Sequence, residues 1–342
     1  MRYKLLGRSG LRVSELCLGT MTFGQQQWGT SEEEAQKIYQ TFRERGGNFV
    51  DTANEMYAGG CSEEILGRLV SDHRDDMVIA TKYGFHMPGG RNPNAAGNQR
   101  KSLVRSLEAS LRRLNTDYVD VLWIHGWDGI TPADEIMRAL DDVVRQGKVL
   151  HIGISNVPAW VVAQCNTLAD LRGWTSFIGV QAEYSLVERA VERELRPMTE
   201  ALNLSIAAWS PLASGILSGK YSSQASDGGK RLDTMQLKQV DERNLAIAEA
   251  VGTVARQLER SPAQVALNWL RAKPAVIPLL GVRTLSQLED NLGCLDFHLD
   301  SDQIAALDQV SAIELGYPHD FLTGARMVGH GGFFDALDLQ ER

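Results

Sequence analysis

Short apolar runs alternate with longer amphipathic stretches along most of this chain. The short runs are rich in Val, Ile, Leu and Phe, and such runs bounded by turn-forming residues are typical of buried β-strands. This pattern predicts eight strands, at or near Val13–Leu18, Asn48–Val50, Met77–Thr81, Val119–Ile124, His151–Ile154, Phe177–Gln181, Ser205–Trp209 and Val276–Leu280.

The stretches between these runs have the period of amphipathic helices. Thr131 and Ser261, each followed by proline, are predicted N-caps, and Gly147 is a predicted helix stop. The helices are predicted at Ser31–Arg45, Ser62–Val70, Asn98–Leu114, Pro132–Gln146, Pro158–Leu168, Val191–Leu202, Asp241–Leu258, Pro262–Arg271 and Ser286–Leu292.

Strands that alternate with helices in this way favour a closed parallel barrel, the (β/α)8 or TIM barrel of the α/β class. An open doubly wound sheet is the competing interpretation, and it would usually carry a G-x-G-x-x-G turn after its first strand. No such motif follows any predicted strand. We expect a single barrel domain over 1–342, made of a hairpin at 1–12, a regular barrel at about 13–311, long loops at 85–97 and 213–238, and a tail at 312–342.

Net charge and cysteine content limit the possible binding partners and the cellular compartment. The formal net charge is −8 and the pI is about 5.5, which argues against a nucleic-acid partner because such proteins need a basic surface. The four cysteines are dispersed and form no CxxC pair, as in proteins of a reducing compartment. The N-terminal segment has neither a signal-peptide core nor a spanning helix. We expect a cytoplasmic protein with no membrane partner, as a monomer or a homo-oligomer.

Four polar side chains follow consecutive predicted strands: Asp51, Tyr57, Lys82 and His125. Residues just past the C-terminal ends of barrel strands meet at one mouth, where barrel enzymes have their active sites. A tyrosine is a weak acid at neutral pH unless a nearby cation favours its anion, and a lysine paired with an aspartate supplies that cation. A histidine adds a group that titrates near neutrality. The set suits proton delivery to a carbonyl oxygen.

Each of the four also has a structural interpretation when taken alone, such as a turn-forming aspartate or a buried core histidine. Their joint position is what favours an active site. A metal-dependent hydrolase that uses His125 and Asp51 is a further alternative. The histidines of the chain show neither HxH nor HExxH spacing, which disfavours it.

The segments around these residues resemble the signatures of the aldo-keto reductase family, in the branch that includes bacterial reductases and potassium-channel β subunits. The resemblance covers roughly 3–311 and implies a (β/α)8 barrel that binds NADPH without a Rossmann turn, with Asp51, Tyr57, Lys82 and His125 as its catalytic tetrad. It rests on FVDTANEMYAGGCSEEILG, VIATKYG, VDVLWIH, GKVLHIGISN, VQAEYSLVER, WSPLASGILSGKY and PLLGVRTLSQLEDNLG.

The chain departs from the family pattern between Asp51 and Tyr57. The family usually has four residues there, and this chain has five. Either a bulge absorbs the extra residue and Tyr57 stays the acid, or the phenol is displaced. We expect an NADPH-dependent reductase of a small aldehyde or ketone, working reversibly. The alternative is a non-catalytic NADPH-binding partner protein like the channel β subunits.

The resemblance also implies the cofactor-binding residues. Ser155, Asn156 and Gln181 end two strands, and their hydroxyl and amide groups suit a nicotinamide carboxamide. Trp209 is implied to stack on the nicotinamide. Lys220 and Arg231 either neutralise phosphate groups or are solvated surface charges. The segment implied to wrap the pyrophosphate contains Ser210, Pro211, Leu212 and Gly215, and the floor beneath the nicotinamide contains Gly19, Thr20 and Met21.

The adenosine end is implied to lie after the eighth strand. By resemblance Arg283 faces the 2′-phosphate, where a guanidinium fork can bind two oxygens, so NADPH is expected ahead of NADH without excluding NADH. Its implied neighbours are Gly281, Thr284, Gln287, Asp290 and Asn291. The substrate stays open. Trp28, Met56, Phe85, His86, Trp127 and the aromatic residues of the tail are candidate pocket walls without assigned roles.

Overall fold

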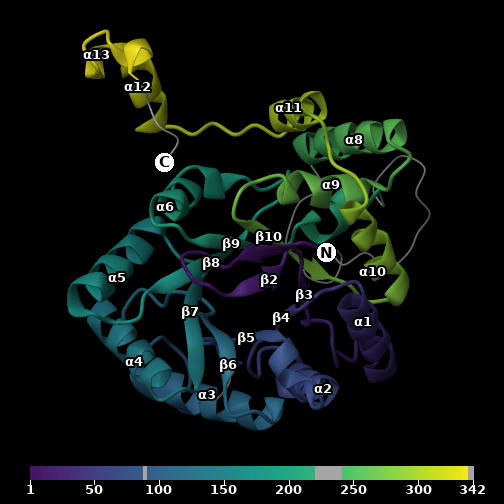
Figure 1. Ribbon diagram of the computed structural model, residues 1–342, viewed down its shortest axis with the longest axis vertical. Helices are drawn as coiled ribbons and strands as arrows, with labels where there is room; N and C mark the ends of the chain where they lie inside the picture. Colours follow the sequence, from purple (N-terminus) through teal and green to yellow (C-terminus); the bar gives the residue numbers. More distant parts are fainter. Residues whose placement is uncertain (88–90, 220–240, 338–342) are drawn as a thin grey trace.

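A closed barrel of eight parallel strands forms the centre of the computed structural model, which describes residues 1–87, 91–219 and 241–337 (Figure 1). The predicted fold class is confirmed. Around the barrel the strands follow the order β10-β3-β4-β5-β6-β7-β8-β9, so neighbours in sequence are neighbours in space except where β10 closes onto β3. The strands are β3 (Cys17–Gly19), β4 (Phe49–Asp51), β5 (Val78–Tyr83), β6 (Val119–Ile124), β7 (Val149–Ser155), β8 (Phe177–Glu183), β9 (Ser205–Trp209) and β10 (Val276–Gly281).

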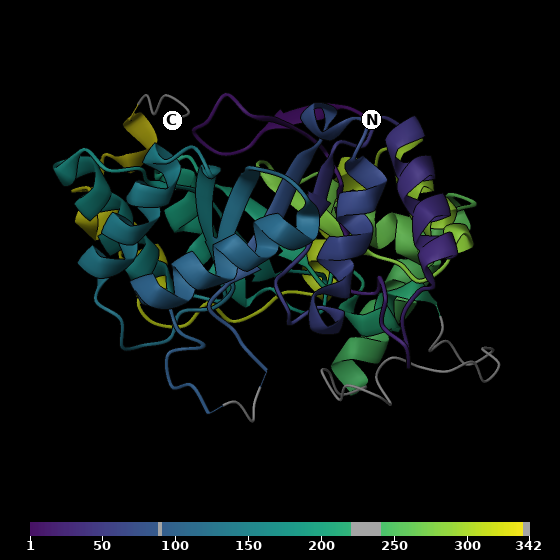
Figure 2. The same ribbon diagram turned by 90° about the horizontal axis from the view of Figure 1, so that it is seen from below.

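Helices surround the barrel in both views (Figures 1 and 2). Their apolar faces pack on the outer faces of the strands and form the larger of two cores. They are α1 (Glu32–Glu44), α2 (Cys61–Val70), α3 (Arg100–Leu114), α4 (Ala133–Arg145), α5 (Ala159–Arg172), α6 (Leu195–Ala201), α8 (Glu242–Gln257), α9 (Pro262–Arg271), α10 (Leu285–Leu292) and α11 (Ser301–Val310). The short helices α12 (His319–Gly324) and α13 (Arg326–Gly329) lie away from the barrel.

Several predicted helix boundaries need correction. The helix α5 continues past Leu168 to Arg172, because its stop is Gly173, which has a left-handed φ of 64°. Thr131 does not cap α4, whose N-cap is Pro132, and its hydroxyl instead donates to Asp128 over 2.6 Å. The predicted cap at Ser261 is confirmed as a full capping box. The helix α11 and the short α12 and α13 were not predicted.

The hairpin of β1 (Tyr3–Leu5) and β2 (Arg12–Ser14) crosses one end of the barrel (Figure 2). Leu6 and Val13 pack with the residues that fill the barrel interior, so the hairpin closes the end at which the strands begin. The predicted strand Val13–Leu18 is therefore wrong as a single element. Its first residues belong to the hairpin, and only Cys17–Gly19 enter the barrel.

Side chains alternate between the two faces of each strand and so fill the interior in layers. On β6, Val121 and Trp123 point inward, and Trp123 is fully buried. Gly153 makes room for that ring, because a Cβ at this position would lie 2.1 Å from the indole. The next inward position after Trp123 is His125, at the open end. The same alternation on β4 places Phe49 and Asp51 on the inward face.

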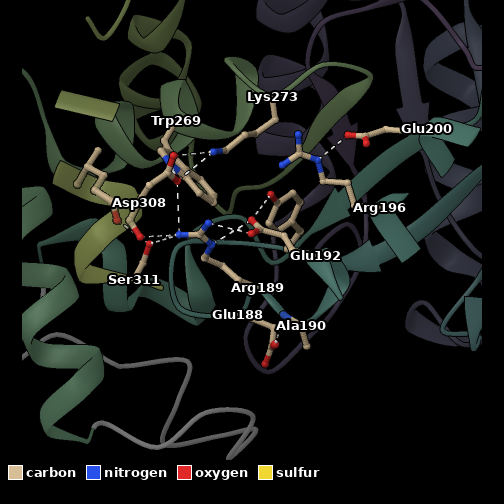
Figure 3. A network of polar contacts seen from close by, with 12 residues as sticks. Glu188, Arg189, Ala190, Glu192, Arg196, Glu200, Trp269, Lys273, Asp308 and Ser311 are labelled. Carbon is tan, nitrogen blue, oxygen red and sulfur yellow. Dashed lines mark hydrogen bonds and ion pairs between the residues drawn. The ribbon is translucent and has the colours of Figure 1, made fainter. Parts of the chain in front are cut away.

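A group of charged residues fastens α11 to the loop after β8 (Figure 3). Arg189 donates to Glu192 on one side and, on the other, to the Asp308 carbonyl oxygen over 2.8 Å and the Ser311 hydroxyl over 2.9 Å. Asp308 also accepts from the Trp269 indole over 2.9 Å and from Lys273 over 3.0 Å. Beyond α11, the chain leaves the barrel and carries α12 and α13 outward (Figure 1). None of the helices in the described ranges could cross a membrane.

Candidate active site

Lys82 lies at the centre of the polar cluster in the barrel mouth. Its side chain and that of Asp51 are fully buried and form an ion pair. The Lys82 ammonium also donates to the Thr52 carbonyl oxygen over 2.6 Å and lies 3.5 Å from the Tyr57 hydroxyl oxygen. The other oxygen of Asp51 accepts from Gln181 Nε2 over 2.9 Å. Asp51, Thr52 and Tyr57 therefore surround one buried ammonium group, and Gln181 from β8 holds the Asp51 carboxylate.

A turn absorbs the extra residue between Asp51 and Tyr57. The Tyr57 amide donates to the Asn54 carbonyl oxygen over 3.0 Å, and the Asn54 side chain accepts from the Met56 amide over 3.2 Å. This arrangement is an Asx turn, the motif that asparagine favours in loops. The turn returns Tyr57 to the mouth, where its hydroxyl faces Lys82.

The Tyr57 phenol lies beside the positively charged Lys82 ammonium. Burial by itself lowers the pKa of the Lys82 ammonium, but the Asp51 carboxylate and the Tyr57 hydroxyl outweigh burial and raise that pKa above its ordinary value. Lys82 therefore stays charged at neutral pH. A nearby positive charge stabilises a phenolate relative to a neutral phenol.

His125 contributes a neutral ring. Burial, assisted by the positive charge of Lys82, lowers the pKa of His125 to about 3. The ring is perpendicular to that of Tyr57, with centroids 6.0 Å apart, and it stacks on Phe85 at 4.7 Å. A neutral imidazole has one N–H donor and one acceptor. Its Nδ1 has no hydrogen-bond partner in the part of the chain that the structure describes.

The neighbouring strand ends supply the groups expected to hold a nicotinamide. The Ser155 hydroxyl is buried and has no partner among the described residues, so an external polar group would satisfy it. Asn156 donates to the His125 carbonyl oxygen over 2.8 Å and accepts from the Trp209 indole over 3.2 Å. Trp209 is thereby fixed at the mouth opposite β4 and β5.

The segment after β9 has an unusual backbone. Ser210, Ala213, Ser214 and Gly215 all have positive φ angles, between 49° and 100°. Left-handed conformations cost free energy for residues with a side chain and cluster at functional sites. Pro211 is buried and Leu212 is half-buried within this segment. Lys220 and Arg231 lie outside the described residues.

Arg283 lies just before the start of α10. The guanidinium of Arg283 makes no hydrogen bond or ion pair with any residue in the described ranges, and the Arg283 amide donates to Gln287 Oε1 over 2.9 Å. Thr284 caps the helix. Asn291, on the same helix, is 4% exposed. A guanidinium without a partner among the described residues fits a phosphate group.

Two acidic residues lie near this site: Asp290, which was predicted as a site residue, and Glu34, which was not. The Asp290 carboxylate accepts from Ser261 over 3.0 Å and from Gln264 over 3.1 Å, so it is directed toward the cap of α9. Glu34, from α1, accepts from the Leu285 amide at the start of α10 over 2.7 Å. The sequence showed no acid replacing Arg283, and Glu34 was missed because it lies far away along the chain.

At the floor of the mouth, Thr20 is buried and Met21 is half-buried after Gly19. The Ser62 hydroxyl lies 2.8 Å from Thr20 Oγ1 and 2.9 Å from Thr52 Oγ1. This hydroxyl cluster was also missed. It fixes the segment whose Thr52 carbonyl oxygen accepts a hydrogen bond from Lys82. Its signal in the sequence was a threonine directly after each of two strands, Thr20 after β3 and Thr52 after β4.

Comparison with known proteins agrees with this geometry. The Aldo/keto reductase family matches residues 15–312. The chain is 36% identical to norsolorinic acid reductase of Aspergillus flavus, with 93% of this chain and 83% of the relative covered. It is 38% identical to norsolorinic acid reductase stcV of Emericella nidulans, covering 92% and 82%. It is 35% identical to aryl-alcohol dehydrogenase GME11368 of Pestalotiopsis microspora, covering 96% and 86%. The chain belongs to the aldo/keto reductase family and is an oxidoreductase.

Proposed function

We propose that this enzyme reduces the carbonyl group of an aldehyde or ketone to an alcohol with NADPH, and that Tyr57 donates the proton. The observation that carries the proposal is the contact of the Tyr57 hydroxyl with the buried Lys82 ammonium, 3.5 Å away. The names of the relatives, reductases and an aryl-alcohol dehydrogenase, support a carbonyl–alcohol interconversion.

In this proposal each member of the tetrad has one task. The carbonyl oxygen of the substrate accepts a hydrogen bond from Tyr57 and a second one from the neutral His125. Tyr57 transfers its proton to that oxygen as the carbon receives a hydride. The Lys82 ammonium stabilises the phenolate that remains, and Asp51 holds Lys82 in place. Solvent then restores the Tyr57 proton, so atoms and charges balance. The reverse sequence oxidises an alcohol.

The residues of the mouth fit a nicotinamide dinucleotide, which supplies the hydride when bound. Ser155, Asn156 and Gln181 would hold the carboxamide, and Trp209 would cover one ring face. Asp290 stays a proposed contact of the adenosine end, and its carboxylate also accepts from Ser261 and Gln264. The remaining proposed contacts are Gly19, Thr20, Met21, Ser210, Pro211, Leu212, Gly215, Gly281, Arg283, Thr284, Gln287 and Asn291.

We prefer NADPH to NADH because the Arg283 guanidinium, which has no partner in the described part of the chain, suits a 2′-phosphate. The alternative of a non-catalytic NADPH-binding protein depended on a displaced Tyr57. The turn at Asn54 keeps the hydroxyl beside Lys82 and so favours catalysis.

The test is turnover of 4-nitrobenzaldehyde with NADPH or NADH, read by loss of reduced-cofactor absorbance and by chromatography of the alcohol. We expect one alcohol for each NADPH consumed and a higher kcat/KM with NADPH. Binding of NADPH without turnover across a panel of aldehydes and ketones would support the non-catalytic alternative. Absence of both binding and turnover would contradict either function.

A further inference from the structure

Trp123 lies beside Lys82 in the wall of the barrel. The two residues are register partners on the neighbouring strands β5 and β6, and both side chains are fully buried. Neighbouring strands lie about 4.8 Å apart, so side chains on the same face of register partners belong to one layer of the interior. Lys82 therefore shares its layer with a large indole ring.

Two glycines set the direction of this ring. Gly153 on β7 and Gly179 on β8 continue the row of register partners that starts at Lys82 and Trp123. A Cβ at Gly153 would lie 2.1 Å from the indole Cζ3 atom, and a Cβ at Gly179 would lie 3.3 Å from the Cη2 atom. Both atoms belong to the six-membered ring, which therefore extends over β7 and β8. The Nε1 atom lies on the opposite edge of the indole and is turned away from these two strands.

This Nε1 atom is a buried hydrogen-bond donor that the fold leaves unused. It makes no hydrogen bond with any residue in the described ranges. An indole N–H can only donate, and a buried donor without an acceptor destabilises the fold. The equally buried indole of Trp269 shows the usual arrangement, because its Nε1 donates to Asp308 over 2.9 Å. The side chains that pack around Trp123 in the barrel interior are apolar, so its acceptor has to come from the mouth above them.

The carboxylate of Asp51 is the group at the mouth on which this indole acts. Burial raises the pKa of Asp51, and the Lys82 ammonium, the Gln181 amide and the Trp123 indole act against burial. Lys82 and Gln181 already donate to this carboxylate, one to each oxygen. A carboxylate has about four lone-pair sites, so a third donor can be accommodated.

We infer that Trp123 is a positioning residue of the active site: its indole N–H donates to the Asp51 carboxylate and so holds Asp51 in the orientation that keeps Lys82 beside Tyr57. The inference rests on the proposed function, because Trp123 acts on proton transfer only through the contact of Lys82 with Tyr57.

The first test follows the indole N–H signals by NMR and needs no turnover. The chain has seven tryptophans, and with isotopically labelled indole nitrogens the Trp123 signal is the one that is missing in Trp123→Phe. Asp51→Asn makes the acceptor neutral, so the Trp123 proton signal should move to higher field and move further than that of Trp209, which donates to Asn156 at the mouth. Lys82→Met, which removes the cation beside the carboxylate, should also move the Trp123 signal.

A Trp123 signal that keeps its position in both variants would overturn the inference. The two proposals fail separately. If the wild-type protein showed no turnover, a Trp123 signal that moves in Asp51→Asn would retain the contact with the carboxylate and remove the proposed reaction.

The second test compares two buried tryptophans. Trp123→Phe should lower kcat for 4-nitrobenzaldehyde about tenfold, the usual effect of losing one hydrogen bond to a charged group, and should leave the Kd for NADPH unchanged. Trp269→Phe is the matched control, since it removes an equally buried indole N–H on the outer side of the barrel, and it should keep the wild-type kcat. Equal losses of kcat in the two variants would overturn the positioning role.

The third test separates the N–H group from the packing of the ring. Trp123→Phe also vacates space beside Gly153, and Gly153→Ala adds a methyl group to that space. In the double variant Trp123→Phe/Gly153→Ala, the free energy of unfolding should recover part of its loss, whereas kcat should stay about tenfold below that of the wild type. A kcat that recovers together with the stability would show that Trp123 acts by packing alone and would contradict the positioning role.

Discussion

The Nζ atom of Lys82 lies 3.5 Å from the hydroxyl oxygen of Tyr57, although the chain has one residue more than its family usually has before that tyrosine. The insertion is confined to the Asx turn that starts at Asn54. The two groups that we propose for proton transfer therefore remain together, and the longer turn has contacts of its own with the segment after β5.

His125 should make the stability of the fold depend on pH. Its pKa is lowered to about 3 in the folded protein, whereas an unfolded histidine titrates near 6.5. The unfolded state therefore binds the proton first, and stability is lost as pH falls from about 6.5 toward about 3.

Between pH 7.5 and pH 5, this single group should lower the free energy of unfolding by about 2 kcal/mol. Urea denaturation at the two pH values measures the change. His125→Asn should remove that part of the slope. A slope equal to wild type in His125→Asn would show that the ring does not titrate as proposed.

Glu34 should weaken the binding of NADPH relative to NADH. Its carboxylate accepts from the Leu285 amide at the start of α10, close to the proposed site of the 2′-phosphate. In Glu34→Gln the repulsion is lost, and Kd for NADPH should fall about fivefold, corresponding to about 1 kcal/mol. Quenching of tryptophan fluorescence measures both Kd values.

In the same experiment, the Kd for NADH should change little. Glu33→Gln is the matched control, because Glu33 is exposed and adjacent in the same helical turn. Equal changes for both cofactors, or an effect of Glu33→Gln as large as that of Glu34→Gln, would place the 2′-phosphate elsewhere.

Arg189 should be important for stability, and Arg196 should not, although both form ion pairs in the same region (Figure 3). The Arg189 and Glu192 side chains are 11% and 14% exposed. Arg189→Ala leaves Glu192 buried without its cation and should cost about 3 kcal/mol. Arg196→Ala breaks a pair with the half-exposed Glu200 and should cost about 0.5 kcal/mol.

Chemical denaturation followed by tryptophan fluorescence measures this difference, since Trp269 lies at the centre of the group and accepts a cation–π contact from Arg189. Equal losses in the two variants would mean that burial does not control the strength of these ion pairs.

Much of the fold could be predicted from the sequence because the barrel strands are short apolar runs with clear ends. The meeting of Asp51, Tyr57, Lys82 and His125 at one mouth could be predicted because they follow such runs. The first strand was misplaced because Val13 and Cys17 are both buried, so the pattern runs through the break between hairpin and barrel. Helix α11 was missed because its only buried residue is Leu307, which leaves little periodic signal.

Contacts between distant segments could not be predicted from local pattern. Glu34 reaches α10 from α1, and Arg189 reaches α11 from the loop after β8. Phe85 was a candidate pocket wall without a role, because its stacking on His125 depends on how two loops meet. Asp290 was implied as a cofactor contact by the family resemblance, and its hydrogen bonds with Ser261 and Gln264 on another helix could not be predicted from local pattern.

The most direct test of the central claim is the rate of Tyr57→Phe with NADPH and 4-nitrobenzaldehyde, measured together with the Kd for NADPH. The substitution removes only the hydroxyl, so we predict an unchanged Kd and a kcat lower by about 100- to 10,000-fold. Tyr118→Phe, which removes a surface hydroxyl bonded to Asp75, is the control and should retain the wild-type rate. A Tyr57→Phe enzyme that keeps wild-type kcat would contradict the assignment of Tyr57 as the proton donor.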